Sequence, residues 1–328
     1  MNSNVRQSNF ELLRLVSMIM VMIGHASGYV EEGDLAGAYG VSKLFVNQLC
    51  LVSVDVFVMI SGWFGIRASA KGAFKLLFQV WFLALLCFFV FYALGLPVSF
   101  KKDLLPYLLF GSGYWFVVSY LVLYALSPVL NAFVEHATKK EFVSTLTAFF
   151  LTAFVFGFLL DKGHFDLGFS PLSFIGLYLL ASYSRLYPGK LFSLNKTMDI
   201  LIYLGVTVIS ALLFWGGYKW FGMGFHLNHN DSPLNIVAAL YLLLYFSKIQ
   251  FQSRFVNWLA ASAFAMYLIH EHSLVSPYFH QLFHHLFDAV PLAAYYPLMI
   301  ILLFLMGFTF IVIDKIRLLI WGLIQRAS

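Results

Sequence analysis

Residues 10–29 read FELLRLVSMIMVMIGHASGY, an apolar stretch that also carries Glu11, Arg14 and His25. A helix of about 20 residues crosses the hydrocarbon core of a bilayer, so this length predicts a membrane-spanning helix. With about 3.6 residues per turn and a rise of about 1.5 Å per residue, Arg14 and His25 share one face about 16 Å apart. Because a charge inside a bilayer costs roughly 2.5–3.5 kcal/mol, this face is expected to line a protein interior or an aqueous cavity.

The composition indicates a polytopic helical membrane protein. Of the 328 residues, 61% are hydrophobic and 11% are charged, and the mean hydropathy is +0.85. A soluble domain carries about 25% charged residues, so that class is excluded. The net charge is +5, but the basic residues form no patch or arm, and no nucleic-acid partner is expected. The two cysteines, Cys50 and Cys87, lie in apolar stretches and are expected to be buried thiols.

The apolar stretches predict an all-α transmembrane bundle of about ten spans. The linkers between them are short, so we expect one integral-membrane domain over residues 1–328. Placing the N-terminus in the cytoplasm puts most of the 20 lysines and arginines on the cytoplasmic side. This is the bias that the positive-inside rule expects, and it also makes the C-terminus cytoplasmic. The expected spans are roughly 10–30, 43–65, 73–95, 114–134, 142–160, 171–187, 198–221, 233–248, 257–275 and 293–321.

The ionisable face of the first span predicts a functional site. Imidazole titrates near neutrality, so His25 could take a proton from an attacking hydroxyl. Arg14 could hold an anionic or carbonyl-bearing group with its fixed donors, and Glu11 could orient Arg14. The alternative interpretation is a structural ion pair beside a hydrogen-bonded core histidine.

The segment SVDVFVMISGWF, residues 53–64, places a further acid, Asp55, near the middle of the second span. By depth, Asp55 falls between Arg14 and His25 and could pair with either. We therefore count Asp55 as a catalytic candidate, with charge neutralisation of Arg14 alone as the alternative. The dipeptide Ser61-Gly62 in the same segment permits close contact with another helix.

Two surface segments are weaker candidates for substrate binding. Arg67 and Lys71, followed by Lys75, could receive the phosphates of a nucleotide-bearing substrate. A topology signal or a lipid-headgroup contact explains the same residues, and the sequence favours that explanation. Trp115, in the aromatic run 114–116, is typical of an interface anchor but could also stack on a sugar ring.

The segment YLIHEH, residues 267–272, carries His270 and His272 in the ninth expected span. On a helix these two side chains lie about 200° apart, so together they are poor ligands for one metal. His226 and His229 lie in a predicted outer loop, where no cysteine or inward carboxylate completes a ligand set. We therefore expect no metal site and count His270 among the substrate-binding candidates.

Several of these segments resemble the integral-membrane acyltransferase 3 family. Arg14 and His25, separated by ten residues and preceded by an acid, are similar to the hallmark of its first helix. Residues 54–64 are similar to its second-helix signature, and residues 114–131 and 262–274 to two later ones. The resemblance runs from about residue 10 to the last expected span.

The resemblance implies O-acyl transfer, most often of acetyl, from cytoplasmic acyl-CoA such as acetyl-CoA to a hydroxyl of a cell-surface or lipid-linked saccharide. It implies a multi-pass protein of the plasma (inner) membrane, with His25 as the catalytic residue and Arg14 in donor handling. Arg14 or Ser61 could stabilise the oxyanion. Many family members carry Arg-x-x-Arg after the second helix, where this chain has Arg67 and Lys71. That departure weakens the assignment of this turn to the CoA phosphates.

A secondary transporter or exporter of a glycan precursor or organic anion is the alternative function. Ten spans with intramembrane Glu11, Arg14 and Asp55 would suit such a protein. No inverted repeat is visible in the sequence, and this favours the transferase. The two functions differ chemically, because a transferase in detergent releases CoA when it is given an acceptor, whereas a transporter leaves its substrate unmodified.

Overall fold

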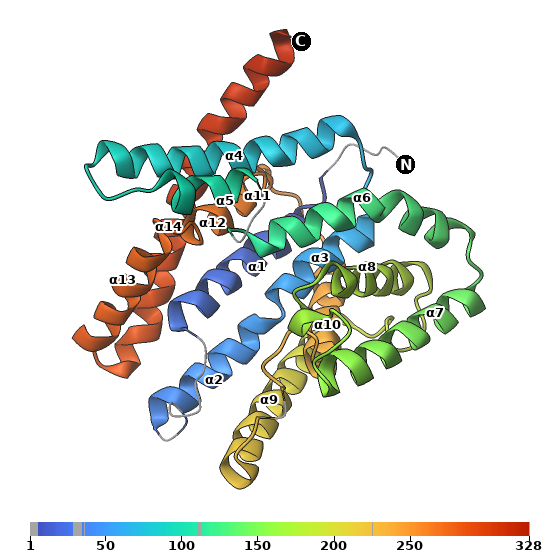
Figure 1. Cartoon of the computed structure of the whole chain (residues 1–328). Coiled ribbons are helices and arrows are strands. Elements are labelled where there is room, and N and C mark those ends of the chain that lie inside the picture. The colour runs from blue at the N-terminus through green and yellow to red at the C-terminus, as the bar shows by residue number, and fades with distance from the viewer. Residues whose placement is uncertain (1–5, 29–34, 36, 110–112, 225, 328) are drawn as a thin grey trace. The chain divides into compact units, whose positions relative to one another are not determined.

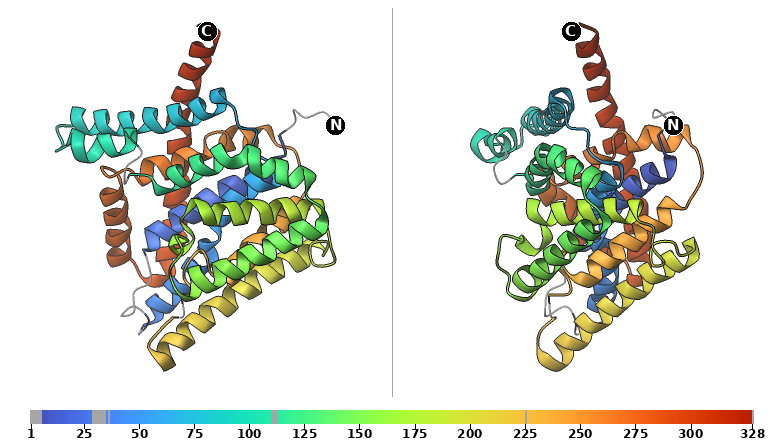
Figure 2. Two further views of the ribbon diagram at one scale, coloured as in Figure 1. Left: turned by 45° about the vertical axis from the view of Figure 1, so that its right-hand side comes forward. Right: turned by 90° about the vertical axis from the view of Figure 1, so that its right-hand side faces the viewer.

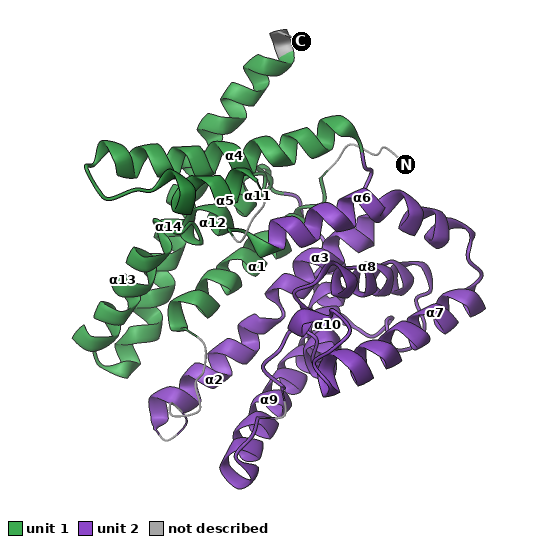
Figure 3. Cartoon of the chain, viewed as in Figure 1, with its two compact units in different colours: residues 1–28, 69–115, 253–328 green, residues 29–68, 116–252 purple. Residues whose placement is uncertain are grey.

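The computed structural model describes residues 6–28, 35, 37–109, 113–224 and 226–327 (Figure 1). Every regular element in these ranges is a helix, which confirms the predicted all-α fold. The chain forms two compact units, coloured separately in Figure 3. Unit 1 comprises residues 1–28, 69–115 and 253–328, and unit 2 comprises residues 29–68 and 116–252. The expectation of one domain over residues 1–328 stays a prediction.

Seven helices of the described part of the chain are long and apolar enough to cross a membrane: Ser8–Ser27, Ala38–Phe64, Ala70–Ala93, Trp115–His136, Lys139–Leu159, Lys196–Phe221 and Leu292–Gln325. The other three expected spans are shorter or broken helices. The expected spans 171–187 and 233–248 form helices of 16 and 15 residues, and the stretch 257–275 forms two short helices. Ten spans and cytoplasmic termini stay predictions, and residues 29–30 lie outside the described residues.

Unit 1 is built around the first helix, α1 (Ser8–Ser27), which packs against α11, α12, α13 and α14. Its other elements are α4 (Ala70–Ala93), η2 (Phe100–Leu104), α5 (Leu105–Leu108), α11 (Arg254–Ala260), α12 (Ala263–His270), α13 (Ser276–Ala289) and α14 (Leu292–Ala327). In Figure 2 the last turns of α14 extend beyond the other helices of this unit. Helix α12 also packs against α4 and α14, so it lies at the centre of unit 1.

Helix α1 runs parallel to the α11–α12 pair, in matched register. At its start, Ser8 Oγ accepts a hydrogen bond of 2.9 Å from the backbone N–H of Ser253. At its end, the ring of His25 meets the ring of His270. Both pairs are 245 residues apart in the sequence. The rise per residue is the same in all α-helices. The equal sequence separation at both ends therefore shows that α1 and the α11–α12 pair advance by the same length, despite the break at residues 261–262.

Unit 2 contains the remaining helices, with α3 packed against α8 and α10, and α9 packed against α10 and α2. Figure 2 shows α9 lying along α10. The elements are α2 (Ala38–Leu51), α3 (Ser53–Phe64), α6 (Trp115–His136, of which the first residue belongs to unit 1), α7 (Lys139–Thr152), η3 (Ala153–Leu159), η4 (Asp166–Gly168), α8 (Pro171–Leu186), α9 (Lys196–Phe221) and α10 (Pro233–Ser247).

The predicted close helix contact at Ser61-Gly62 is confirmed, and its partner is α8. A Cβ atom at Gly62 would collide with the backbone of Tyr178. Ser182 Oγ donates a hydrogen bond of 2.8 Å to the Gly62 carbonyl, so the two backbones are also bonded across this contact. The absence of a side chain at Gly62 therefore allows α3 and α8 to meet.

We expect Gly62→Ala to destabilise the protein by about 1–3 kcal/mol, because backbone atoms of α8 cannot move aside as a flexible side chain would. The measurement is the Tm of the purified protein in detergent. Gly205→Ala in α9 is the matched control, because nothing lies within 4 Å of a Cβ at that position. The control should keep or slightly raise the Tm, and equal Tm values for the two variants would contradict the packing argument.

Candidate active site

His25 lies in the last turn of α1, where the helix stops abruptly. The stop is Gly28, whose φ of 71° is a conformation that glycine adopts without strain. The Gly28 N–H donates to the His25 carbonyl at 3.2 Å. The His25 side chain is 23% exposed, so it is held by its surroundings and still reachable by a substrate.

Two acceptor groups meet His25 within unit 1. Its Nδ1 atom lies 2.9 Å from Nε2 of His270 and 2.9 Å from Oε1 of Glu271. His270 is the last residue of α12 and is fully buried, and Glu271 is the next residue along the chain. The C-terminal end of α12 thus places the His270 ring and the Glu271 carboxylate beside the C-terminal end of α1.

The hydrogen bonds of His270 determine where the protons lie. Nδ1 of His270 is 2.5 Å from the Met266 carbonyl, which can only accept, so this nitrogen carries the hydrogen. In the neutral ring Nε2 is then an acceptor, and the carboxylate of Glu271 is an acceptor as well. His25 Nδ1 is therefore the donor to both, and a neutral His25 ring then has its lone pair on Nε2. A lone pair on an oriented imidazole is the requirement for a general base or a nucleophile.

His25, His270 and Glu271 also have the composition of a metal site. One ligand atom from each of the three residues lies within 4.8 Å of the others. Two imidazole nitrogens and a carboxylate oxygen suit zinc or another transition metal. His272 is not part of this set, in agreement with its predicted position on the opposite face. The expectation of no metal site stays a prediction.

Aromatic side chains hold the turn that follows α12. The ring of Tyr107 stacks on the ring of His272 with centroids 4.3 Å apart, and the Tyr107 hydroxyl accepts from the Ser273 N–H at 2.6 Å. Burial raises the pKa of Tyr107, so the phenol stays neutral. The Tyr114 hydroxyl donates to the Leu268 carbonyl. These contacts fix the backbone on both sides of Glu271.

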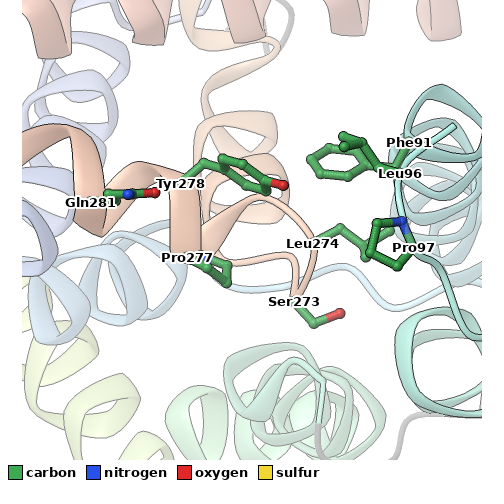
Figure 4. Close-up of a pocket in the computed structure, with 8 residues that line it drawn as sticks. All are labelled: Phe91, Leu96, Pro97, Ser273, Leu274, Pro277, Tyr278 and Gln281. Atoms are coloured by element: carbon green, nitrogen blue, oxygen red, sulfur yellow. The ribbon is translucent and has the colours of Figure 1, made fainter. Parts of the chain in front are cut away.

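Residues that follow Glu271 line a pocket of about 330 Å³ within unit 1. Figure 4 shows the ring of Phe91 from α4 facing the ring of Tyr278 from α13, and their centroids are 5.7 Å apart. Ser273, only two residues after Glu271, lies on the wall and donates to Asp103 Oδ1 at 3.1 Å. The remaining lining residues are Leu96, Pro97, Leu274, Pro277 and Gln281. This volume falls within the usual range for small-ligand sites.

The predicted ion pair between Arg14 and Glu11 is confirmed. Arg14 Nη1 lies 2.8 Å from Glu11 Oε1. Glu11 is buried, whereas a third of the Arg14 side chain is exposed. Helix α1 is continuous from Arg14 to His25, so the two residues share a face about 16 Å apart. The role of Arg14 in donor handling stays a prediction.

Asp55 and Ser61, the other candidates for the chemistry, both lie on α3 in unit 2. Asp55 is buried, and its Oδ2 accepts from Asn235 Nδ2 at 2.9 Å. Ser61 Oγ lies 3.0 Å from the Tyr120 hydroxyl. The catalytic role of Asp55 and the oxyanion role of Ser61 stay predictions.

The surface candidates are distributed over both units. Arg67 follows α3 in unit 2 and is exposed, and Lys71 is exposed in the first turn of α4 in unit 1. Trp115 begins α6 and is 36% exposed. Their substrate-binding roles stay predictions, as does the role of His270 in binding substrate. No role was predicted for Glu271, although it stands beside His270 in the segment YLIHEH.

Comparison with known proteins identifies the family of the chain. A family model described as an acyltransferase domain matches residues 7–314, essentially the whole chain. No curated protein and no solved structure matches the chain. The matched range includes His25, His270 and Glu271, and together with seven apolar helices it indicates a multi-pass membrane protein. The chain therefore belongs to the acyltransferase 3 family of membrane acyltransferases.

Proposed function

We propose that the protein is an O-acyltransferase of the plasma (inner) membrane, using cytoplasmic acyl-CoA as donor and a saccharide hydroxyl as acceptor. Acetyl-CoA is the proposed donor, following the family resemblance. The observation that carries the proposal is the position of His25 Nδ1, 2.9 Å from both His270 Nε2 and Glu271 Oε1. That arrangement orients an imidazole with its Nε2 lone pair available to a substrate.

In the proposed reaction, the acceptor hydroxyl gives its proton to His25 Nε2 as its oxygen attacks the thioester carbonyl carbon. The carbon–sulfur bond then breaks, and the imidazolium proton passes to the departing CoA sulfur. The carboxylate of Glu271 stabilises the imidazolium formed between these two steps, as the acid does in a Ser-His-Asp triad. In a second version, His25 Nε2 itself attacks the thioester carbonyl carbon, the carbon–sulfur bond breaks, and CoA leaves as a thiolate. The acceptor hydroxyl then attacks the acyl-imidazolium, its acyl–nitrogen bond breaks, and the hydroxyl proton passes to the thiolate.

The test is to incubate the purified protein in detergent with acetyl-CoA and a panel of glycan acceptors. We expect release of free CoA that depends on the acceptor, together with a product heavier by one acetyl group. A second series with longer acyl-CoA donors measures the acyl preference. A protein that releases no CoA with any acceptor, but moves an unmodified glycan precursor or organic anion into sealed vesicles, would be a transporter instead.

We expect Arg14→Ala to raise the KM for acetyl-CoA by about 10- to 100-fold, because a charged hydrogen bond contributes about 1.5–3 kcal/mol. The measurement is the rate of CoA release as a function of donor concentration. Arg14→Lys is the matched variant, since it keeps the charge beside buried Glu11 but loses the planar donor pair. A folded Arg14→Ala variant with an unchanged donor KM would leave Arg14 with a structural role only.

A further inference from the structure

A small polar cavity lies within unit 2, and its lining includes none of the residues that take part in the proposed reaction on α1 and α12. It has a volume of about 20 Å³, room for about one water molecule or one metal ion. Asp55 of α3, Asp231 and Asn230 from the turn before α10, and Ser173 of α8 supply its polar walls. The remaining lining residues are Phe149, Phe150, Ala153, Phe165, Gly168, Leu177 and Ile236.

The two carboxylates that line this cavity lack the partners that buried acids require. Asp55 is 1% exposed and Asp231 is 7% exposed. Asp55 Oδ1 and both carboxylate oxygens of Asp231 are buried without a hydrogen-bond partner. Among the described residues that line the cavity, none is a lysine, arginine or histidine. An unpaired buried carboxylate costs several kcal/mol, so a bound cation or a shared proton is needed to stabilise the two acids.

The backbone holds Asp231 rigidly against the cavity. The Leu167 carbonyl accepts from the N–H groups of Asn230 and Asp231, at 3.1 and 3.3 Å. Gly168, with a φ of +94°, passes so close that a Cβ there would lie 2.7 Å from the Asp231 nitrogen. A Cβ at Gly157 would lie 3.3 Å from Asp231 Oδ2. These contacts fix the backbone of Asp231 at the cavity wall.

We propose that this cavity binds a hard divalent cation, with Ca²⁺ as the best match, between the carboxylates of Asp55 and Asp231. Two carboxylates neutralise one divalent ion. The three unpartnered oxygens are the hard ligands that calcium prefers. The side chains of Asn230 and Ser173 supply further oxygens on the same wall. Zinc is a poorer match because the lining offers no nitrogen or sulfur ligand. The bound ion would tie α3 to the turn before α10.

The test is calcium binding by isothermal titration and thermal unfolding of the chelator-treated full-length protein at pH 7.5. A neutral detergent avoids calcium binding to anionic lipid. We expect one Ca²⁺ per chain and a saturable rise in Tm. Asp231→Asn should weaken Ca²⁺ binding at least about tenfold. Asp166→Asn is the matched control. This exposed acid lies between Phe165 and Gly168, which line the cavity, but it is not itself on the cavity wall. It should bind Ca²⁺ like the wild type.

Three results would overturn the proposal. The first is a wild-type protein that binds no Ca²⁺ and shows no change in Tm with it. The second is calcium binding that Asp166→Asn abolishes and Asp231→Asn preserves. The third is a wild-type Tm that ignores Ca²⁺ but rises as the pH falls from 8 to 5, because the two carboxylates would then share a proton. Asp55→Asn should weaken Ca²⁺ binding in the same way as Asp231→Asn. If Asp55→Asn does not fold, the comparison of Asp231→Asn with the wild type still tests the proposal.

Discussion

His25→Ala is expected to reduce kcat for acyl transfer by about 10³-fold or more, because the imidazole that acts as base or nucleophile in the proposed reaction is removed. General-base catalysis alone contributes about 10²- to 10⁴-fold, and the acyl-imidazole route loses its nucleophile as well. The measurement is acceptor-dependent CoA release by the purified variant in detergent, at saturating donor and acceptor.

The control for His25→Ala must separate chemistry from folding, because His25 also bonds α1 to the end of α12. His25→Gln is the matched variant, since its amide can still donate toward His270 and Glu271 but cannot act as a base at neutral pH. Both variants should insert in the membrane and elute as the wild type does. Full activity in either folded variant would remove His25 from the proposed mechanism.

Glu271→Gln is expected to reduce kcat by about 10²- to 10⁴-fold with little change in either KM, because its carboxylate stabilises the imidazolium and does not hold a substrate. The neutral amide keeps the size of the side chain but loses the charge. It can also present its NH₂ group to His25 Nδ1, which would favour the wrong tautomer of the ring. The measurement is kcat and both KM values from CoA release.

Glu271→Asp distinguishes positioning from a general structural role. The shorter carboxylate keeps the charge, so it should restore part of the kcat that Glu271→Gln loses. If both variants instead raise the donor or acceptor KM and leave kcat unchanged, then Glu271 binds substrate. If added zinc raises the activity of the wild type and neither variant responds, the three residues hold a metal, and the proposed role of Glu271 is wrong.

The first span shows what local sequence can establish. Arg14, Glu11 and His25 lie on one continuous helix, so their shared face follows from helical geometry alone, and the Arg14–Glu11 ion pair is a contact between neighbouring turns. The membrane class follows equally from composition, because long apolar stretches with few charges have no stable alternative in water.

Contacts between distant segments were not predictable in the same way. The pairing of His25 with Glu271 spans most of the chain and depends on where α12 ends. Periodicity predicted one span over residues 257–275, whereas the helix breaks at residues 261–262 and stops at His270. The stop at His270 places Glu271 beside His25.

The sequence alone determined that this is an all-helical membrane protein of the acyltransferase 3 type, with an ionisable face on its first helix, because those properties depend on composition and on spacing within one segment. Only the tertiary structure decided which groups surround His25 and which surround Asp55. Glu271 and His270 contact His25, and Asn235 donates a hydrogen bond to Asp55. Hydrogen bonds across hundreds of residues depend on how helices pack, and spacing within a segment carries no record of that packing.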